Sequence, residues 1–224
     1  AVARAAGFSG QDLSLEHVSY GTMMGKDGRP FRTRSGDTVK LAELLEEAKQ
    51  RAYDLVTEKN PMLPDSQRRD IAERVGIGAI KYADLSKNRT SDYIFDWSTM
   101  LSFEGNTAPY LLYAYARIKS ILRKAPEKSY DAIQSLSEPE ERALCLKMLQ
   151  LGEIIEAVDR DCMPNQLCNY LYELSGLFMK FYENCPILKG EISQTESRLA
   201  LCRLTAETLQ QGLELLGITP LEQM

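Results

Sequence analysis

Helical periodicity over residues 105–224 constrains this fold more than any other feature of the sequence. Apolar residues recur there every three or four positions, which is the spacing of one face of an α-helix. One predicted helix carries Leu144, Leu151 and Val158 on such a face. Capping boxes and a C-terminal stop separate the helices, namely Ser137 with Glu140, Ser193 with Glu196, and Gly217. The pattern predicts four helices that pack as an all-α bundle.

Residues 1–104 predict a smaller, mixed region before the bundle. Asp37 and Thr38 can cap a helix that stops at Pro61, and a second helix is expected from Asp65. Two glycines weaken the middle of that second helix, Gly76 and Gly78. The following stretch, "ADLSKNRTSDYIFDW", predicts a loop and a short strand. The expected fold class is therefore mainly α, with a helical bundle preceded by a smaller mixed part.

Composition excludes several classes of protein. A chain of 224 residues that is 44% apolar can bury one or two compact cores. Its formal charge of −5 argues against a generally basic nucleic-acid protein, although residues 21–40 and 117–128 form two basic patches. The five cysteines lack a C-x-x-C pair and His17 is the only histidine, so no metal site is expected. No apolar run is long enough for a membrane span, and the free thiols suit a reducing cytoplasm.

The loop at residues 25–36, "GKDGRPFRTRSG", is a candidate anion site. It spaces four cations among glycines, a proline and two hydroxyls, without helical or strand periodicity. Backbone N–H groups and guanidinium groups in such a loop can face a phosphate. A solvated basic turn is the alternative that its residue types also fit.

An aromatic and cationic stripe is the second candidate site. Tyr110, Tyr113 and Arg117 align on one face of a predicted helix, beside its apolar stripe. Phenol rings and guanidinium groups stack on nucleic-acid bases, and the guanidinium also pairs with phosphates. The alternative is the edge of an amphipathic core in which the tyrosine hydroxyls are satisfied locally.

Three motifs in order resemble the carboxy-terminal portion of bacterial arginyl-tRNA synthetases. They are "HVSYGTMMGKDGRPFRTRSGDTVKLAELL", "KYADLSKNRTSDYIFDW" and "FEGNTAPYLLYAYAR", and the likeness continues to "RLTAETLQQGLELLGITPLEQM". The resemblance implies that residues 1–104 are the end of a class I, Rossmann-type catalytic domain with connecting helices. It implies that residues 105–224 are the all-α anticodon-binding domain.

The same resemblance assigns residues to two sites. The loop corresponds to the class I K-M-S-K-S loop, so that Arg32, Thr33 and Arg34 are the expected catalytic residues. Pro30 stands where the general motif has its first lysine. Lys26 is a hypothetical substitute for that lysine, and the expected ATP-binding residues are Lys26, Arg32 and Arg34. Anticodon contacts are implied on one helix and at the chain end, at Asn106, Tyr110, Tyr113, Arg117 and Met224. Leu112 stands where relatives commonly carry Gln, and the weaker candidates are Tyr170, Tyr172 and the terminal Met224.

The resemblance also implies an activity for the parent protein. The parent would use ATP and magnesium to ligate arginine to its tRNA through an arginyl-adenylate. It would be a cytoplasmic monomer with no membrane partner. The motif that grips ATP and the amino-acid pocket are missing here, so we expect the chain alone to be inactive and to bind no cofactor tightly. Two alternatives are a stand-alone, non-catalytic helical RNA-binding module and a purely structural helical scaffold.

Overall fold

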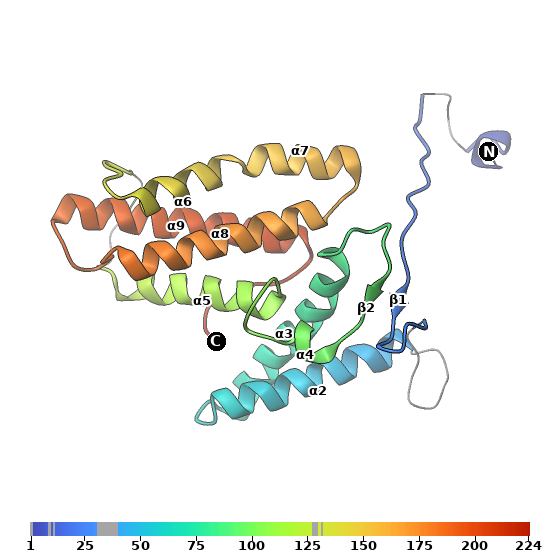
Figure 1. Cartoon of the computed structure of the whole chain (residues 1–224), viewed down its shortest axis with the longest axis horizontal. Helices are drawn as coiled ribbons and strands as arrows, with labels where there is room; N and C mark the ends of the chain where they lie inside the picture. Colours follow the sequence, from blue (N-terminus) through green and yellow to red (C-terminus); the bar gives the residue numbers. More distant parts are fainter. Residues whose placement is uncertain (1, 9, 11, 31–39, 127–129, 131) are drawn as a thin grey trace.

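The computed structural model describes residues 2–8, 10, 12–30, 40–126, 130 and 132–224. The first part contains α1 (Val2–Ala5), β1 (Met23–Met24), α2 (Leu41–Lys59), α3 (Asp65–Leu85), β2 (Tyr93–Ile94) and α4 (Trp97–Met100). The second part contains α5 (Ala108–Lys124), α6 (Pro139–Leu149), α7 (Leu151–Asp161), α8 (Asn165–Asn184) and α9 (Ile192–Leu215). The prediction of a mainly α fold is confirmed (Figure 1).

A bundle of α5, α6, α8 and α9 makes up most of the second part (Figure 1). α5 packs against α8 and α9, and α6 packs against the same two helices from the other side. Each helix contributes side chains that are fully buried, among them Leu111, Ile118, Leu144, Leu171, Phe178, Phe181, Leu199 and Leu209. Burial of such stripes is the main source of stability for amphipathic helices.

The helix between residues 137 and 161 differs from the prediction. It is divided at Gln150 into α6 and α7, because the Gln150 backbone N–H bonds to the carbonyl of Lys147, three residues back. α7 lies on the outside against α8, and none of its residues is fully buried.

The predicted starts of α6 and α9 are wrong by one or two residues, whereas α3 begins at Asp65 as predicted. The capping box of α6 pairs Glu138 with Glu141, not Ser137 with Glu140. α9 already begins at Ile192, so Ser193 lies inside its first turn. The C-terminal stop at Gly217 is confirmed, because this glycine has a φ of 69° and the N–H of Ile218 bonds to the carbonyl of Leu213.

α2 and α3 form an antiparallel pair that packs beneath one end of the bundle (Figure 1). α2 ends at Lys59, as the Asn60–Pro61 pair predicts, whereas the predicted caps Asp37 and Thr38 lie outside the described residues. The two helices approach closely at Gly76. A Cβ atom on this residue would lie only 2.7 Å from the carbonyl carbon and oxygen of Ala48. Gly76 therefore permits the contact between the helices instead of merely weakening α3.

The apolar core runs from the α2–α3 pair into the bundle without a break. α3 packs against α5, and Val75 and Tyr82 belong to the same buried cluster as Leu111 and Phe178. A second, small cluster joins Leu44 to Phe95 and Met100. The division of the chain between residues 104 and 105 stays a prediction, since packing continues across it.

β1 and β2 form a two-stranded parallel sheet in the first part. Met23 pairs with Tyr93 and Met24 pairs with Ile94, which confirms the short strand predicted in "DYIFDW". Within the described ranges, no helix has the length and apolar character that crossing a bilayer requires.

Candidate nucleic-acid interface

Capping at Thr107 fixes the start of α5, the helix that carries the aromatic and cationic stripe. The Thr107 side chain accepts a hydrogen bond from the Tyr110 N–H at 3.3 Å and donates one to the carbonyl of Ser102 at 2.6 Å. Pro109 occupies the first turn, where its missing N–H removes no helical hydrogen bond. α5 therefore begins at a defined position and presents its stripe at a defined angle.

Arg117 is held between two aromatic rings. Its Cζ atom lies 4.8 Å from the centroid of Tyr113 and 5.1 Å from the centroid of Tyr182, which comes from α8. Arg117 also donates a hydrogen bond to the Tyr113 hydroxyl. Contacts of a guanidinium with aromatic faces are attractive, and they fix its plane here. Tyr113 and Arg117 are half-buried, so this stacked pair forms part of the surface.

A cavity of about 410 Å³ opens beside this pair. Its lining comes from α5, α8 and the chain end, at Tyr113, Ala116, Arg117, Ser120, Ile121, Arg123, Lys124, Tyr182, Gln223 and Met224. Three of these side chains are cationic, and the aromatic faces and a thioether supply apolar surface. Such a site fits an unstacked base with its phosphate. The structure thus brings together three of the predicted anticodon residues: Tyr113, Arg117 and Met224.

Tyr110 lies outside this cavity. It pairs edge-on with Tyr172 of α8, with the ring centroids 5.5 Å apart. Burial, together with Tyr172 and Glu183, raises the pKa of Tyr110 above its ordinary value. Tyr110 and Tyr172 therefore form a second aromatic site, one turn toward the start of α5.

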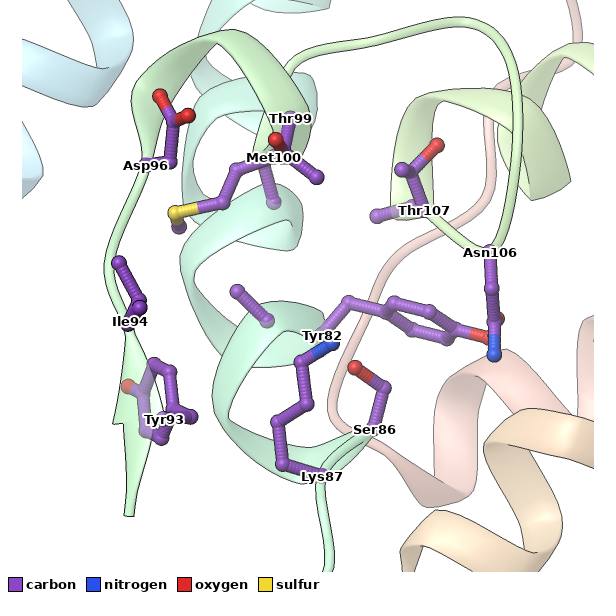
Figure 2. A pocket seen from close by; sticks show the side chains of 13 residues that line it. Tyr82, Ser86, Lys87, Tyr93, Ile94, Asp96, Thr99, Met100, Asn106 and Thr107 are labelled. Carbon is purple, nitrogen blue, oxygen red and sulfur yellow. The ribbon is translucent and has the colours of Figure 1, made fainter. Parts of the chain in front are cut away.

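Asn106 takes part in a polar contact between helices. The Tyr82 hydroxyl lies 2.5 Å from Asn106 Oδ1 and 2.9 Å from the carbonyl oxygen of Cys168, and Asn106 Nδ2 donates to Asn169 Oδ1 at 3.1 Å. Figure 2 shows the Tyr82 ring extending from α3 toward Asn106, across one side of a cavity of about 220 Å³. Burial raises the pKa of Tyr82 well above its ordinary value, so its hydroxyl stays a donor. Asn106 thus joins α3 to α5 and α8, which the sequence pattern does not predict.

Tyr82→Phe should lower the free energy of unfolding by about 1–2 kcal/mol, because it leaves buried acceptors without their donor. Urea denaturation measures this loss. Tyr20→Phe is the matched control, since Tyr20 is 87% exposed and its hydroxyl should contribute less than about 0.5 kcal/mol. Equal stabilities for the two variants would contradict the role of Tyr82.

Two further residues named from the resemblance, Tyr170 and Leu112, lie in the core. Tyr170 is 1% exposed, and Leu112, at the position where relatives commonly carry Gln, is 0% exposed. Neither side chain reaches the cavity beside Arg117. Tyr182 and Lys124 line the cavity but were not predicted from the sequence. Tyr182 lies 65 positions after Arg117, and no local pattern joins the two. Lys124 follows Arg117 by seven positions, and helical spacing could have found it.

The basic loop is described only at its start. Arg32, Thr33 and Arg34 lie outside the described residues. The start is a tight turn, in which the Gly25 N–H bonds to the carbonyl of Arg29 at 2.7 Å and Gly28 has a φ of 70°. Lys26 projects from this turn and pairs with Asp96 at 3.1 Å. Hydrogen bonds from Ser98 and then from Lys26 lower the pKa of Asp96. Lys26 is thus at the surface, and its ion pair is open to solvent on the lysine side, whereas Asp96 is half-buried.

Comparisons with known proteins match two parts of the chain to two different family models. Residues 111–224 match the family model of the DALR anticodon binding domain, and residues 1–97 match that of the catalytic domain of tRNA synthetases class I (R). The match over residues 1–97 argues against the alternatives of a stand-alone RNA-binding module and a structural scaffold.

Similar proteins are arginine–tRNA ligases. The one from Colwellia psychrerythraea is 58% identical over the whole chain, and so is the one from Azotobacter vinelandii. The chain spans 39% of the length of each of these relatives. The solved arginyl-tRNA synthetase of Thermus thermophilus is 35% identical with a TM-score of 0.84, and the alignment covers 93% of this chain and 35% of that one. The chain therefore belongs to the DALR anticodon binding domain family, and it is similar to the carboxy-terminal portion of class I arginyl-tRNA synthetases.

Proposed function

We propose that the whole protein ligates arginine to its tRNA with ATP, and that the part described here recognises the anticodon loop. Residues 105–224 would form the anticodon-binding domain, and residues 1–104 would form the end of the catalytic domain. The arrangement of Arg117 between Tyr113 and Tyr182, beside Met224, carries the proposal, because it offers stacking surface and positive charge in one cavity. Asn106 and Tyr110 would act at the edge of the same interface, through the contacts with α8.

The basic loop would contribute to adenylation in the whole enzyme. Arg32, Thr33 and Arg34 are the proposed catalytic residues, and Lys26, Arg32 and Arg34 would hold the ATP phosphates. The exposed position of Lys26 supports this role, since its ion pair with Asp96 costs little to exchange for a phosphate. ATP, with magnesium, would supply the phosphoanhydride that activates the arginine carboxylate, while the loop cations stabilise the triphosphate. The chain alone would form no arginyl-adenylate.

We further propose that the whole enzyme is a cytoplasmic monomer. All five cysteines are free thiols, and Cys168, Cys185 and Cys202 are buried. Burial raises the pKa of Cys168 to about 12, which keeps this thiol protonated and unreactive. Free thiols are typical of a reducing compartment and support this location.

Tyr113→Ala tests the proposed recognition. We expect it to weaken binding of an arginine-tRNA anticodon stem-loop by about 5- to 30-fold, because one stacking surface and the fixed position of Arg117 are lost. Binding should be measured in a salt series, with the stem-loop of another tRNA beside it, since phosphate attraction alone disappears with salt. Tyr20→Ala is the matched control, because this exposed tyrosine lies outside the cavity. Equal and salt-sensitive binding of both stem-loops by the unmodified chain would reject the proposal.

A further inference from the structure

The segment after α9 crosses α5 on its way to the cavity. Gly217 ends α9, and the Lys81 amine of α3 donates a hydrogen bond to the Gly217 carbonyl. Ile218 and Leu221 are then buried, at 2% and 4% exposure. Ile218 and Leu221 therefore anchor this segment in the core, and the three residues after Leu221 lie along α5.

Glu222 is the polar anchor of this segment. Its carboxylate lies 3.1 Å from the Lys119 amine and 3.3 Å from the Tyr115 hydroxyl, and its backbone carbonyl accepts a hydrogen bond from Arg123 at 2.8 Å. These three partners are spaced four residues apart, so they form one stripe of α5. Burial, followed by the neighbouring Glu222 charge, raises the pKa of Tyr115 to about 12, which keeps its hydroxyl a donor.

The next stripe of α5 faces the cavity. It contains Tyr113, Arg117, Ser120 and Lys124, and Met224 completes the lining only two residues after Glu222. Met224 is half-buried and packs against the main core cluster. The position of the Met224 thioether in the cavity thus depends on where Glu222 fixes the chain across α5.

We propose that Glu222 is a positioning residue for RNA recognition, because it places Met224 in the wall of the cavity. The inference rests on the proposed function, because it concerns the same cavity. Glu222 itself does not contact the phosphates, since a carboxylate beside a polyanion is repelled. It acts through Met224, whose flexible and polarizable side chain fits an irregular apolar surface such as a base.

If Glu222 acted only through its charge, its removal would change RNA binding differently than if it positions Met224. Glu222 shares its single negative charge between Lys119 and Arg123, so its removal leaves one more net positive charge at this end of α5. Binding of any RNA should then become stronger at low salt, and the salt dependence should steepen by up to about 0.7 in slope. Positioning instead predicts a loss of selectivity for the arginine-tRNA loop. The two effects are measured separately in one titration.

Glu222→Gln in the whole 224-residue chain is the test. We expect the ratio of the dissociation constants of the two stem-loops to fall by about fivefold. It should approach the ratio that the Met224→Ala variant shows for the same two stem-loops. The double variant should lose no more selectivity than Met224→Ala, because residues that act through one another are not additive. Glu153→Gln is the matched control, because it removes the same charge from α7, which contributes nothing to the cavity.

Methyl NMR of the methionines gives a second readout that needs no RNA. Because Met224 shares the cavity with two aromatic rings, its methyl signal should move toward the value of an unstructured methionine in Glu222→Gln and stay in Glu153→Gln. An unchanged Met224 signal with unchanged selectivity would overturn the inference. Absence of selectivity in the unmodified chain, together with a displaced Met224 signal, would instead reject the proposed function and leave the positioning role standing.

Discussion

Arg198→Met should lower the free energy of unfolding by about 3–5 kcal/mol, the largest effect that we expect from a single substitution in this chain. Arg198 and Glu141 form an ion pair at 2.6 Å, and their side chains are only 4% and 2% exposed. Removal of the arginine leaves a buried carboxylate without its counter-ion. Urea denaturation at neutral pH measures the loss.

The structure explains why this pair matters more than the surface pairs. Arg198 of α9 also donates to the Pro186 carbonyl at 2.9 Å, and Glu141 accepts from the backbone N–H of Ser137 at 2.7 Å and from that of Glu138 at 3.1 Å. The pair therefore ties α9 to the start of α6 and to the loop after α8. The guanidinium of Arg198 and the carboxylate of Glu141 are both hydrogen-bonded beyond their mutual contact, which is the condition under which a buried ion pair is tolerated.

The effect of Arg198→Met should depend on pH. Burial acts to raise the pKa of Glu141, but the hydrogen bonds from Arg198 and from the backbone outweigh it, so the pKa lies below its ordinary value. A lowered pKa in the folded state gives stability above about pH 4.3 that is lost as the pH falls through the folded value. In Arg198→Met the hydrogen bond and the charge of Arg198 no longer oppose burial, so the pKa of Glu141 rises and protonation relieves the variant. The difference between the two proteins should therefore shrink from pH 7 to pH 4.

Two variants check this explanation. Glu141→Leu combined with Arg198→Met should recover part of the loss, because no uncompensated charge remains, whereas the capping contacts of Glu141 stay lost. Arg69→Met is the matched control, since Arg69 pairs with Asp65 at the surface and is 69% exposed. We expect a cost below about 1 kcal/mol for it. A cost in Arg198→Met as small as in Arg69→Met would contradict the role of burial.

Gly76→Ala should lower the free energy of unfolding by about 3 kcal/mol, the upper end of the usual cost of overpacking. The added Cβ atom would lie 2.7 Å from the backbone of Ala48, and Ala48 is 0% exposed. Backbone atoms cannot rotate away as a side chain can, so α2 and α3 would have to separate. Thermal or urea denaturation measures the change.

Gly152→Ala is the matched control for Gly76→Ala. Gly152 lies in α7, and a Cβ atom there would meet no atom within 4 Å. Alanine is a better helix former than glycine, so this variant should gain about 0.5–1 kcal/mol. A gain in Gly76→Ala as well would show that α2 and α3 do not need their close contact.

Sequence periodicity predicts the helices of this chain well, because each long helix buries one continuous stripe. The stripe with Leu199 and Leu209 predicts α9, and that with Leu171 and Phe178 predicts α8. Helix starts are predicted less well, since several neighbouring polar residues can cap and packing chooses between them. Glu138 caps α6 in place of Ser137 because Glu141, the third residue of the helix, is fixed by Arg198.

The candidate cavity could be predicted only in part. Tyr113 and Arg117 share a helix face, so their proximity follows from spacing. Tyr182 and Met224 join them only through packing of α5 against α8 and through the course of the chain after α9. Asn106 stands in the same motif as Tyr113, but its contact with Tyr82 depends on the position of α3. Long-range contacts of this kind leave no local trace in the sequence.

The course of the chain after α9 has a practical consequence for protein engineering. Since Gln223 and Met224 line the cavity beside Arg117, a purification tag fused behind Met224 would emerge inside the proposed RNA-binding surface. Linker residues there would compete with RNA for the same space, and a basic tag would add its own affinity for phosphate. A tag before Val2 would start from α1, far from the bundle (Figure 1), and would leave the cavity open.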